Sequence, residues 1–210
     1  MTGTATGGIW PSSARSAVLS TCGTDSAGAR AVTERDIQHA LYLSLARRER
    51  GRFLIVPNFT PPGWWESDLW LCRASGYTVE HEIKRSRRDF EADGQKAREW
   101  LTVSGDELRA RREHKHELLA SGDNRGPGQF YFVAPKGLLA ADEVPAWAGL
   151  KLVYDHVVSV EKQAPKLHRA KVTDEALDAA CRSTYHRFWK LWLQQYRRLH
   201  RDPQWERFAR

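Results

Sequence analysis

The chain has 210 residues, and 33 lysine and arginine residues against 26 aspartate and glutamate residues give it a formal net charge of +7. This length suits one domain with a substantial core, and the basic balance favours a polyanionic partner without identifying it. No uninterrupted apolar run approaches the ~20 residues of a membrane-spanning helix, and residues 1–8 lack the features of a signal peptide, so we expect a cytoplasmic protein with no membrane contact. Three widely spaced cysteines predict neither a disulfide framework nor a zinc knuckle.

The first quarter of the chain predicts a leader, a helix and a strand. Residues 1–32 are too poor in large apolar side chains to offset the entropy of ordering, and predict a disordered leader. Thr33 then fits a helix N-cap, and the acidic residues and apolar stripe that follow it predict a helix over 33–50. Residues 53–56 predict a short buried strand, and 58–63 predict a loop.

Two charged strands are predicted next, over residues 65–70 and 77–84, with a turn at 73–76 between them. A hairpin lays its two strands side by side, so Asp68 of the first strand can meet side chains of the second. Whether a site forms here therefore depends on which side chains of the second strand share a face with Asp68.

Glu82 and Lys84 are two residues apart, so they project from the same face of the second strand and can converge with Asp68. Two carboxylates can hold a hard divalent cation such as Mg²⁺ or Mn²⁺, and a lysine can stabilise charge or orient the attacking water in phosphodiester hydrolysis. The same alternation allows a plain alternative, in which Glu80, Glu82 and Lys84 form the solvated face of an amphipathic strand.

The stretch after this hairpin is strongly charged. Ser86 fits an N-cap, and the pattern predicts a helix over 86–101. The run at 109–117 has no strand signal and predicts a solvated helix face, so we interpret its acid-x-lysine triplet, residues 113–115, as a decoy. Histidines at 114 and 116 suggest zinc, but at this spacing they point apart on a helix and no further ligand cluster accompanies them.

The rest of the chain completes an α/β pattern. A loop is predicted over residues 121–128. Three strands follow over 129–134, 151–154 and 157–160, and a long helix over 173–201. Helix, three strands, helix and strand predict a mixed sheet covered by helices. We therefore expect an α/β domain over 33–170 and an added basic amphipathic helix in 171–210.

The C-terminal helix has two stripes. Its apolar stripe, which includes Phe188, Leu191 and Trp192, is expected to be buried against the domain or against a second copy of the helix, so a dimer remains open. Its basic stripe either follows a phosphate backbone or is merely solvated. The cations of this stripe that we name as candidate contacts to DNA are Arg182, Lys190, Arg197 and Arg201.

The order of these elements, with Asp68 on the second strand and Glu82-x-Lys84 on the third, resembles the PD-(D/E)XK phosphodiesterase superfamily, whose fold is restriction-endonuclease-like. Four stretches are similar to the MmcB-like family of DNA-repair nucleases and related phage proteins; they span residues 65–68, 82–93, 130–139 and 148–150. The similarity covers about residues 34–169 and does not reach the C-terminal helix.

The resemblance implies a Mg²⁺- or Mn²⁺-dependent deoxyribonuclease that acts in DNA repair or phage DNA processing. It implies that Asp68, Glu82 and the backbone carbonyl of Ile83 bind the metal, and that Lys84 acts on the nucleophilic water or the scissile phosphate. The alternative is a catalytically silent nucleic-acid-binding or interaction module on the same fold.

Other charged residues are candidates for the same cleft. Glu34 shares the inward face of the first helix, although it equally fits a first-turn acid that complements the helix dipole. Glu66 shares a strand face with the first proposed metal ligand, or is a surface acid. Asp89, Asp93 and Lys96 fall on one side of the predicted helix, where they line the cleft or form ordinary salt bridges; Lys96 is also a candidate contact to DNA.

Overall fold

The structure is a computed structural model that describes residues 32–49, 53–104 and 107–199, all of which belong to one compact unit. The predicted leader lies outside the described residues except for Val32, and so does Arg201. No helix in the described part of the chain is long and apolar enough to cross a membrane.

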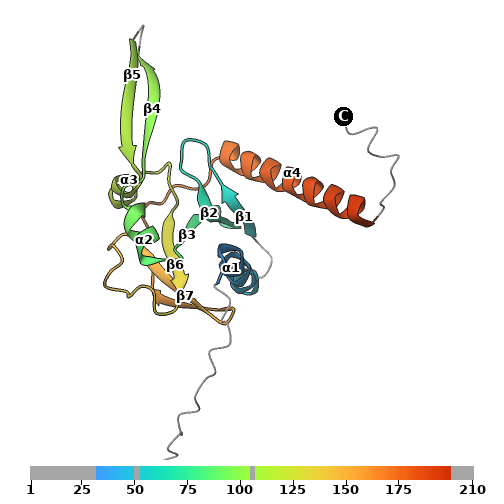
Figure 1. The fold of residues 1–210 in the computed structure, drawn as a ribbon. Helices are drawn as coiled ribbons and strands as arrows, with labels where there is room; N and C mark the ends of the chain where they lie inside the picture. The colour runs from blue at the N-terminus through green and yellow to red at the C-terminus, as the bar shows by residue number, and fades with distance from the viewer. Residues whose placement is uncertain (1–31, 50–52, 105–106, 200–210) are drawn as a thin grey trace, which may run out of the picture. The chain divides into compact units, whose positions relative to one another are not determined.

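A mixed six-stranded sheet forms the centre of the fold (Figure 1). In spatial order its strands are β1 (Phe53–Phe59), β2 (Ser67–Arg73), β3 (Thr78–Ile83), β6 (Gln129–Pro135), β7 (Gly149–Tyr154) and β8 (Val157–Lys162). The β3/β6 and β6/β7 pairs are parallel and the other three are antiparallel. The helices are α1 (Glu34–Glu49), α2 (Arg87–Asp93), α3 (Lys115–Ser121) and α4 (Asp174–Leu199). The predicted α/β class, with its mixed sheet, flanking helices and C-terminal helix, is confirmed.

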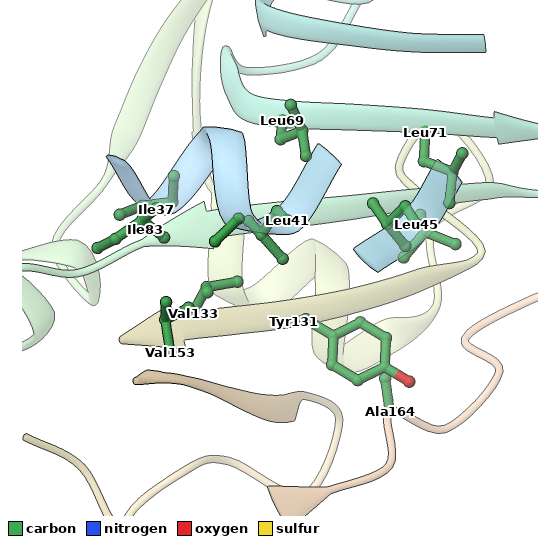
Figure 2. Packing of buried hydrophobic residues seen from close by; sticks show 12 residues of the cluster. Ile37, Leu41, Leu45, Leu69, Leu71, Ile83, Tyr131, Val133, Val153 and Ala164 are labelled. Atoms are coloured by element: carbon green, nitrogen blue, oxygen red, sulfur yellow. The ribbon is translucent and has the colours of Figure 1, made fainter. Parts of the chain in front are cut away.

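Helix α1 covers one face of the sheet. It begins as predicted at Thr33, whose Oγ1 accepts a hydrogen bond from the backbone N–H of Asp36 at 3.3 Å. Ile37, Leu41 and Leu45 recur at helical spacing and are buried against side chains of β2, β3 and β6 (Figure 2). This packing fixes the start of α1 beside the ends of β2 and β3.

The opposite face of the sheet is buried as well. There Phe130 and Phe132 of β6 pack in one cluster with Trp64, which also donates to Glu80 of β3, and over β1 and β2 the face meets Ala180 of α4. Both faces of β3 are therefore inside the protein. The alternative in which charged side chains of this strand form a solvated face is wrong: the exposed fractions of Glu80, Glu82 and Lys84 are 0%, 2% and 2%.

A hairpin replaces most of the two helices predicted between 86 and 117. Helix α2 has the predicted cap, with the Asp89 N–H donating to Ser86 Oγ at 3.1 Å, but it ends at Gly94. Strands β4 (Ala97–Ser104) and β5 (Glu107–His114) then pair with each other and with no strand of the main sheet (Figure 1). The register places Arg98 opposite Glu113, and the two side chains tie the hairpin to the domain, Arg98 by donating to the Trp64 carbonyl at 2.9 Å and Glu113 by its salt bridge with Arg125.

Helix α4 packs on β1 through an unexpected side. Ala180 is buried there, and the guanidinium of Arg187 donates hydrogen bonds to the carbonyl oxygens of Pro57 and Asn58. The predicted apolar stripe stays exposed, with 58% of Phe188 accessible. The expectation that this stripe is buried against the domain is wrong, because small alanines let the helix backbone approach the sheet where large side chains would hold it away.

Candidate active site

Asp68, Glu82 and Lys84, the three residues predicted to carry the chemistry, line one open cleft with a volume of about 450 Å³. Glu34 and Lys96 line the same cleft. The cleft therefore brings together a carboxylate from α1, one from β2 and one from β3, with two ammonium groups.

The β2–β3 hairpin explains why the two predicted metal ligands meet. Its turn closes through a 2.8 Å hydrogen bond from the Gly76 N–H to the Arg73 carbonyl, and Gly76 has a φ of 82°, which favours glycine. The register pairs Leu69 with His81, so the next position along brings Asp68 beside Glu82. Residues directly opposite on an antiparallel pair share a face. The predicted hairpin and the predicted convergence of these carboxylates agree with this register.

Asp68 is an acid with an unusual pKa. The pKa of its carboxyl is raised to about 7, chiefly by burial and in addition by the nearby carboxylates of Glu82 and Glu34. The Ile83 N–H, which donates to Asp68 Oδ2 at 2.6 Å, acts in the opposite direction. Two neighbouring carboxylates thus repel the charge of Asp68, a repulsion that a bound cation would relieve.

Glu82, in contrast, has cations on both of its oxygens. Oε1 accepts hydrogen bonds from Lys84 Nζ at 3.2 Å and from Lys96 Nζ, and Oε2 accepts one from Lys115 Nζ at 2.9 Å. Burial by itself would raise the pKa of Glu82. The positive charges of the three lysines, above all Lys115, outweigh burial and hold the pKa below its usual value. Glu82 is therefore ionised and fixed in place.

Lys115 is a residue of this site that the sequence interpretation missed. Its side chain is completely buried, with Nζ 2.6 Å from Glu80 Oε1 and 5.3 Å above the ring of Phe130. Desolvation lowers the pKa of Lys115, but the carboxylates of Glu80 and Glu82 more than compensate and raise it. The prediction of a solvated helix face at 109–117 is wrong here, because α3 begins at Lys115 and points this residue into the core.

Asp93 anchors Lys84 from the other side. Asp93 Oδ1 lies 2.6 Å from Lys84 Nζ and 2.7 Å from Lys96 Nζ, while Oδ2 accepts a 2.7 Å hydrogen bond from His116 Nε2. Burial opposes ionisation of Asp93, yet the hydrogen bond from His116 and the two ammonium groups hold its pKa well below the usual range. Asp93 thus takes the salt-bridge role that was one of its two predicted interpretations.

The remaining predicted site residues divide between the cleft and the surface. Asp89 lines the cleft, and its Oδ1 lies 4.0 Å from Lys84 Nζ. Glu66 is exposed ahead of β2 and is absent from the cleft lining. Arg182 forms an exposed salt bridge with Asp178 on α4. Lys190 and Arg197 lie exposed on the same helix.

A zinc site finds no support in the described part of the chain. His116 is engaged with Asp93, and its ring also packs edge-on against Trp147 at 4.9 Å between centroids. Across residues 32–49, 53–104 and 107–199, no group of three or more histidine, cysteine, aspartate or glutamate residues is arranged to hold a metal ion. Any metal held by Asp68 and Glu82 would therefore need backbone or water oxygens to complete its coordination.

No protein-family model matches this chain, and a search of curated proteins finds no match either. One solved structure that resembles it is a protein of unknown function from Silicibacter pomeroyi, with 18% sequence identity and a TM-score of 0.47; the alignment covers 80% of this chain and 93% of that chain. A likeness of this degree carries no conclusion about function. The resemblance to the PD-(D/E)XK superfamily stays a prediction.

Proposed function

We propose that this protein is a metal-dependent deoxyribonuclease with a PD-(D/E)XK-type active site. The observation that carries the proposal is the gathering of Asp68, Glu82 and Lys84 in one open cleft, although thirteen residues separate the two acids in the chain. Mg²⁺ or Mn²⁺ is the expected ion, because the donor atoms facing the cleft are oxygens.

The residues around the cleft suit such an ion. Asp68, Glu82 and the backbone carbonyl of Ile83 would hold it, and Glu34 is placed to assist through the same cleft. The metal would supply Lewis-acid activation of the scissile phosphate and of a bound water. The raised pKa of Asp68 supports this fit, since it reflects burial first and then the charges of the neighbouring carboxylates, both of which a bound cation would offset.

Lys84 has a separate task in this proposal. Its Nζ donates hydrogen bonds to both Glu82 and Asp93, so it is held in position before substrate arrives. From there it would stabilise negative charge on the phosphate or orient the attacking water, without paying a reorganisation cost during the reaction.

A second candidate function is a catalytically silent DNA-binding module on the same fold. It is favoured by the saturation of Glu82, whose two oxygens already bind three lysines. For a metal to reach Oε1, the ammonium of Lys96 must leave it. Lys96 lies in the segment between α2 and β4 and is 38% exposed, so its side chain has room to turn toward solvent or toward a phosphate.

Incubation with supercoiled plasmid and with labelled single-stranded DNA separates the two candidates. Wild-type protein should cleave at least one of these substrates in Mg²⁺ or Mn²⁺, and EDTA should stop the reaction. Cleavage that is equal in wild type and in cleft variants, after removal of contaminating nuclease, would reject the active site. Binding without cleavage in either ion would favour the silent module.

Lys84→Met should lower the cleavage rate by about 100-fold or more, by analogy with the loss of one electrostatic donor. Metal affinity should remain within a few-fold, because Asp68 and Glu82 are both kept. Isothermal titration with Mn²⁺ and single-turnover cleavage measure the two effects separately. Glu66→Gln, which removes an exposed acid outside the cleft, is the matched control and should change neither quantity. An unchanged rate in Lys84→Met would remove this lysine from the mechanism.

A further inference from the structure

Helix α4 displays a continuous row of aromatic side chains, which we call the aromatic ladder: Tyr185, Phe188, Trp189, Trp192 and Tyr196. Neighbouring rings touch along the helix. Trp189 and Trp192 have centroids 5.4 Å apart, and Trp192 stacks on Tyr196 at 5.3 Å with 17° between the ring planes. Tyr185 and Phe188 join at the other end through contacts with Trp189, at 6.1 and 5.6 Å.

Four of the five side chains of the ladder are exposed. The exposed fractions of Tyr185, Phe188, Trp189 and Trp192 are 60%, 58%, 41% and 44%. At about 100° per residue, the ladder occupies an arc of about 100° on the helix. Ala180 and Arg187, which contact β1 and the residues beside it, fall outside this arc on the other side of the helix. Exposed aromatic surface of this extent marks a binding surface.

A row of cations runs along one side of the ladder. Arg182, Lys190 and Arg197, with His186 among them, fall within the next ~100° of the helix surface. No aspartate or glutamate occurs between Ala179 and Leu199. Within α4, the carboxylate that pairs with one of these cations is Asp178, which binds Arg182 near the start of the helix.

We propose that α4 binds single-stranded DNA, with bases stacked on the aromatic ladder and phosphates on the adjacent cations. This step rests on the proposed function, and it narrows the expected partner from DNA in general to an unpaired strand. A single strand presents base faces on one side and phosphates on the other, which matches two parallel rows of unlike chemistry. A duplex hides its base faces, so it would use only the cations.

The cations and the leucines of α4 disfavour two other binding partners for the aromatic ladder. A second copy of α4 would bring two rows of cations together, because the cations border the very surface that would pair. An amphipathic helix in a membrane surface gathers its aliphatic side chains at the centre of one face. Here Leu191 and Leu193 point about 160° apart, on either side of the ladder.

The test measures binding of labelled oligo(dT) and of a duplex of equal length by fluorescence anisotropy in EDTA, which excludes cleavage. Trp189→Leu with Trp192→Leu keeps apolar area and helix propensity while it removes two stacking faces. Affinity for oligo(dT) should fall by at least about tenfold, and affinity for the duplex by less than about twofold. Leu191→Ala with Leu193→Ala is the matched control, and should change neither affinity. Circular dichroism should show the same helix content in all variants.

A second variant tests the cations. Arg182→Gln, Lys190→Gln and Arg197→Gln together should make the slope of log affinity against log salt shallower by about 2 units on the single strand, if each contacts one phosphate. Unchanged salt slopes would mean that these side chains are only solvated, and would overturn the phosphate half of the proposal.

Other outcomes overturn the proposal directly. Equal losses on single strand and duplex would mean that no base stacking occurs. If the variant Trp189→Leu with Trp192→Leu still binds phosphatidylserine vesicles, and oligo(dT) is not bound, the surface would be assigned to a membrane. A concentration-dependent dimer that Trp189→Leu and Trp192→Leu abolish would assign it to a second copy. Since these assays need no metal, strand binding without any cleavage would reject the nuclease alone, whereas cleavage without strand binding would reject the ladder alone.

Discussion

Asp68→Asn should abolish metal-dependent cleavage and at the same time stabilise the metal-free protein at neutral and higher pH. The amide cannot supply the negative charge that holds a divalent cation, so the catalytic loss should be complete within the limits of the assay. Stability should change in the opposite direction, because the native structure disfavours the ionised form of this carboxyl.

The pH dependence follows from the raised pKa. Asp68 has a pKa of about 7 in the folded protein against an ordinary value of 3.8, so the folded state binds this proton more tightly than the unfolded state does. Its contribution to stability is fully present below pH ~4, falls as the pH rises toward 7 and is lost above 7. At 1.36 kcal/mol per pKa unit the full difference is about 4 kcal/mol, an upper figure for a group that is partly accessible.

Thermal unfolding in EDTA at pH 4, 6 and 8 measures this effect. The asparagine variant should unfold at a higher temperature than wild type at pH 8, and the gap should close at pH 4, where both side chains are neutral. Glu66→Gln removes an exposed acid and should show no such pH-dependent gap. A gap that is the same at all three pH values would contradict the burial and charge repulsion assigned to Asp68.

The core of the site could be predicted because it depends on local rules. The turn residues around Gly76 predict a hairpin, and the period of two along a strand puts Glu82 and Lys84 on one face. The hairpin and this alternation together are enough to bring Asp68 beside Glu82. The register confirms the hairpin, while the roles assigned to these side chains stay predictions.

The lysine at the back of the site could not be predicted in the same way. Lys115 lies in a segment whose arginine, glutamate and lysine content predicts a solvated helix. Its burial is tolerated only because Glu80 and Glu82, more than thirty residues away in the chain, are buried opposite it. The missed β4–β5 hairpin has the same origin, since Arg98 donates to the Trp64 carbonyl and Glu113 pairs with Arg125, contacts that neither segment predicts alone.

Helix α4 shows the limit of a hydrophobic pattern. A helix was predicted over 173–201, and within the described residues α4 runs over Asp174–Leu199. The pattern could not show which side packs, because that depends on the shape of the partner surface. Ala180 fits closely against β1 and β2, while Trp192 on another side stays accessible. An apolar stripe on a helix predicts a contact surface, but it does not say what the helix contacts. In α4 the contact with the sheet is made by another side of the helix.

Lys115→Met should destabilise the protein by about 3–5 kcal/mol, the largest stability effect we expect from a single change at this site. Methionine fills a similar volume, so packing against Phe130 is largely kept and the loss is electrostatic. Glu82 retains Lys84 and Lys96 as partners. Glu80 would lose its cationic partner, because among the described residues Lys115 is the cation paired with it. Its other hydrogen bond comes from Trp64.

The double variant Glu80→Gln with Lys115→Met isolates this cause. Removing the orphaned charge together with its partner should recover at least half of the loss, because replacing both members of a buried ion pair costs much less than removing one. Urea unfolding at pH 8 measures all three proteins, and Lys166→Met serves as the control for loss of an exposed lysine. The defect of the single variant should also shrink toward pH 5, since burial already raises the pKa of Glu80 and protonation then neutralises it. A loss that neither the second substitution nor acid reduces would mean that Lys115 stabilises the fold through packing, and that the ionised state of Glu80 does not depend on it.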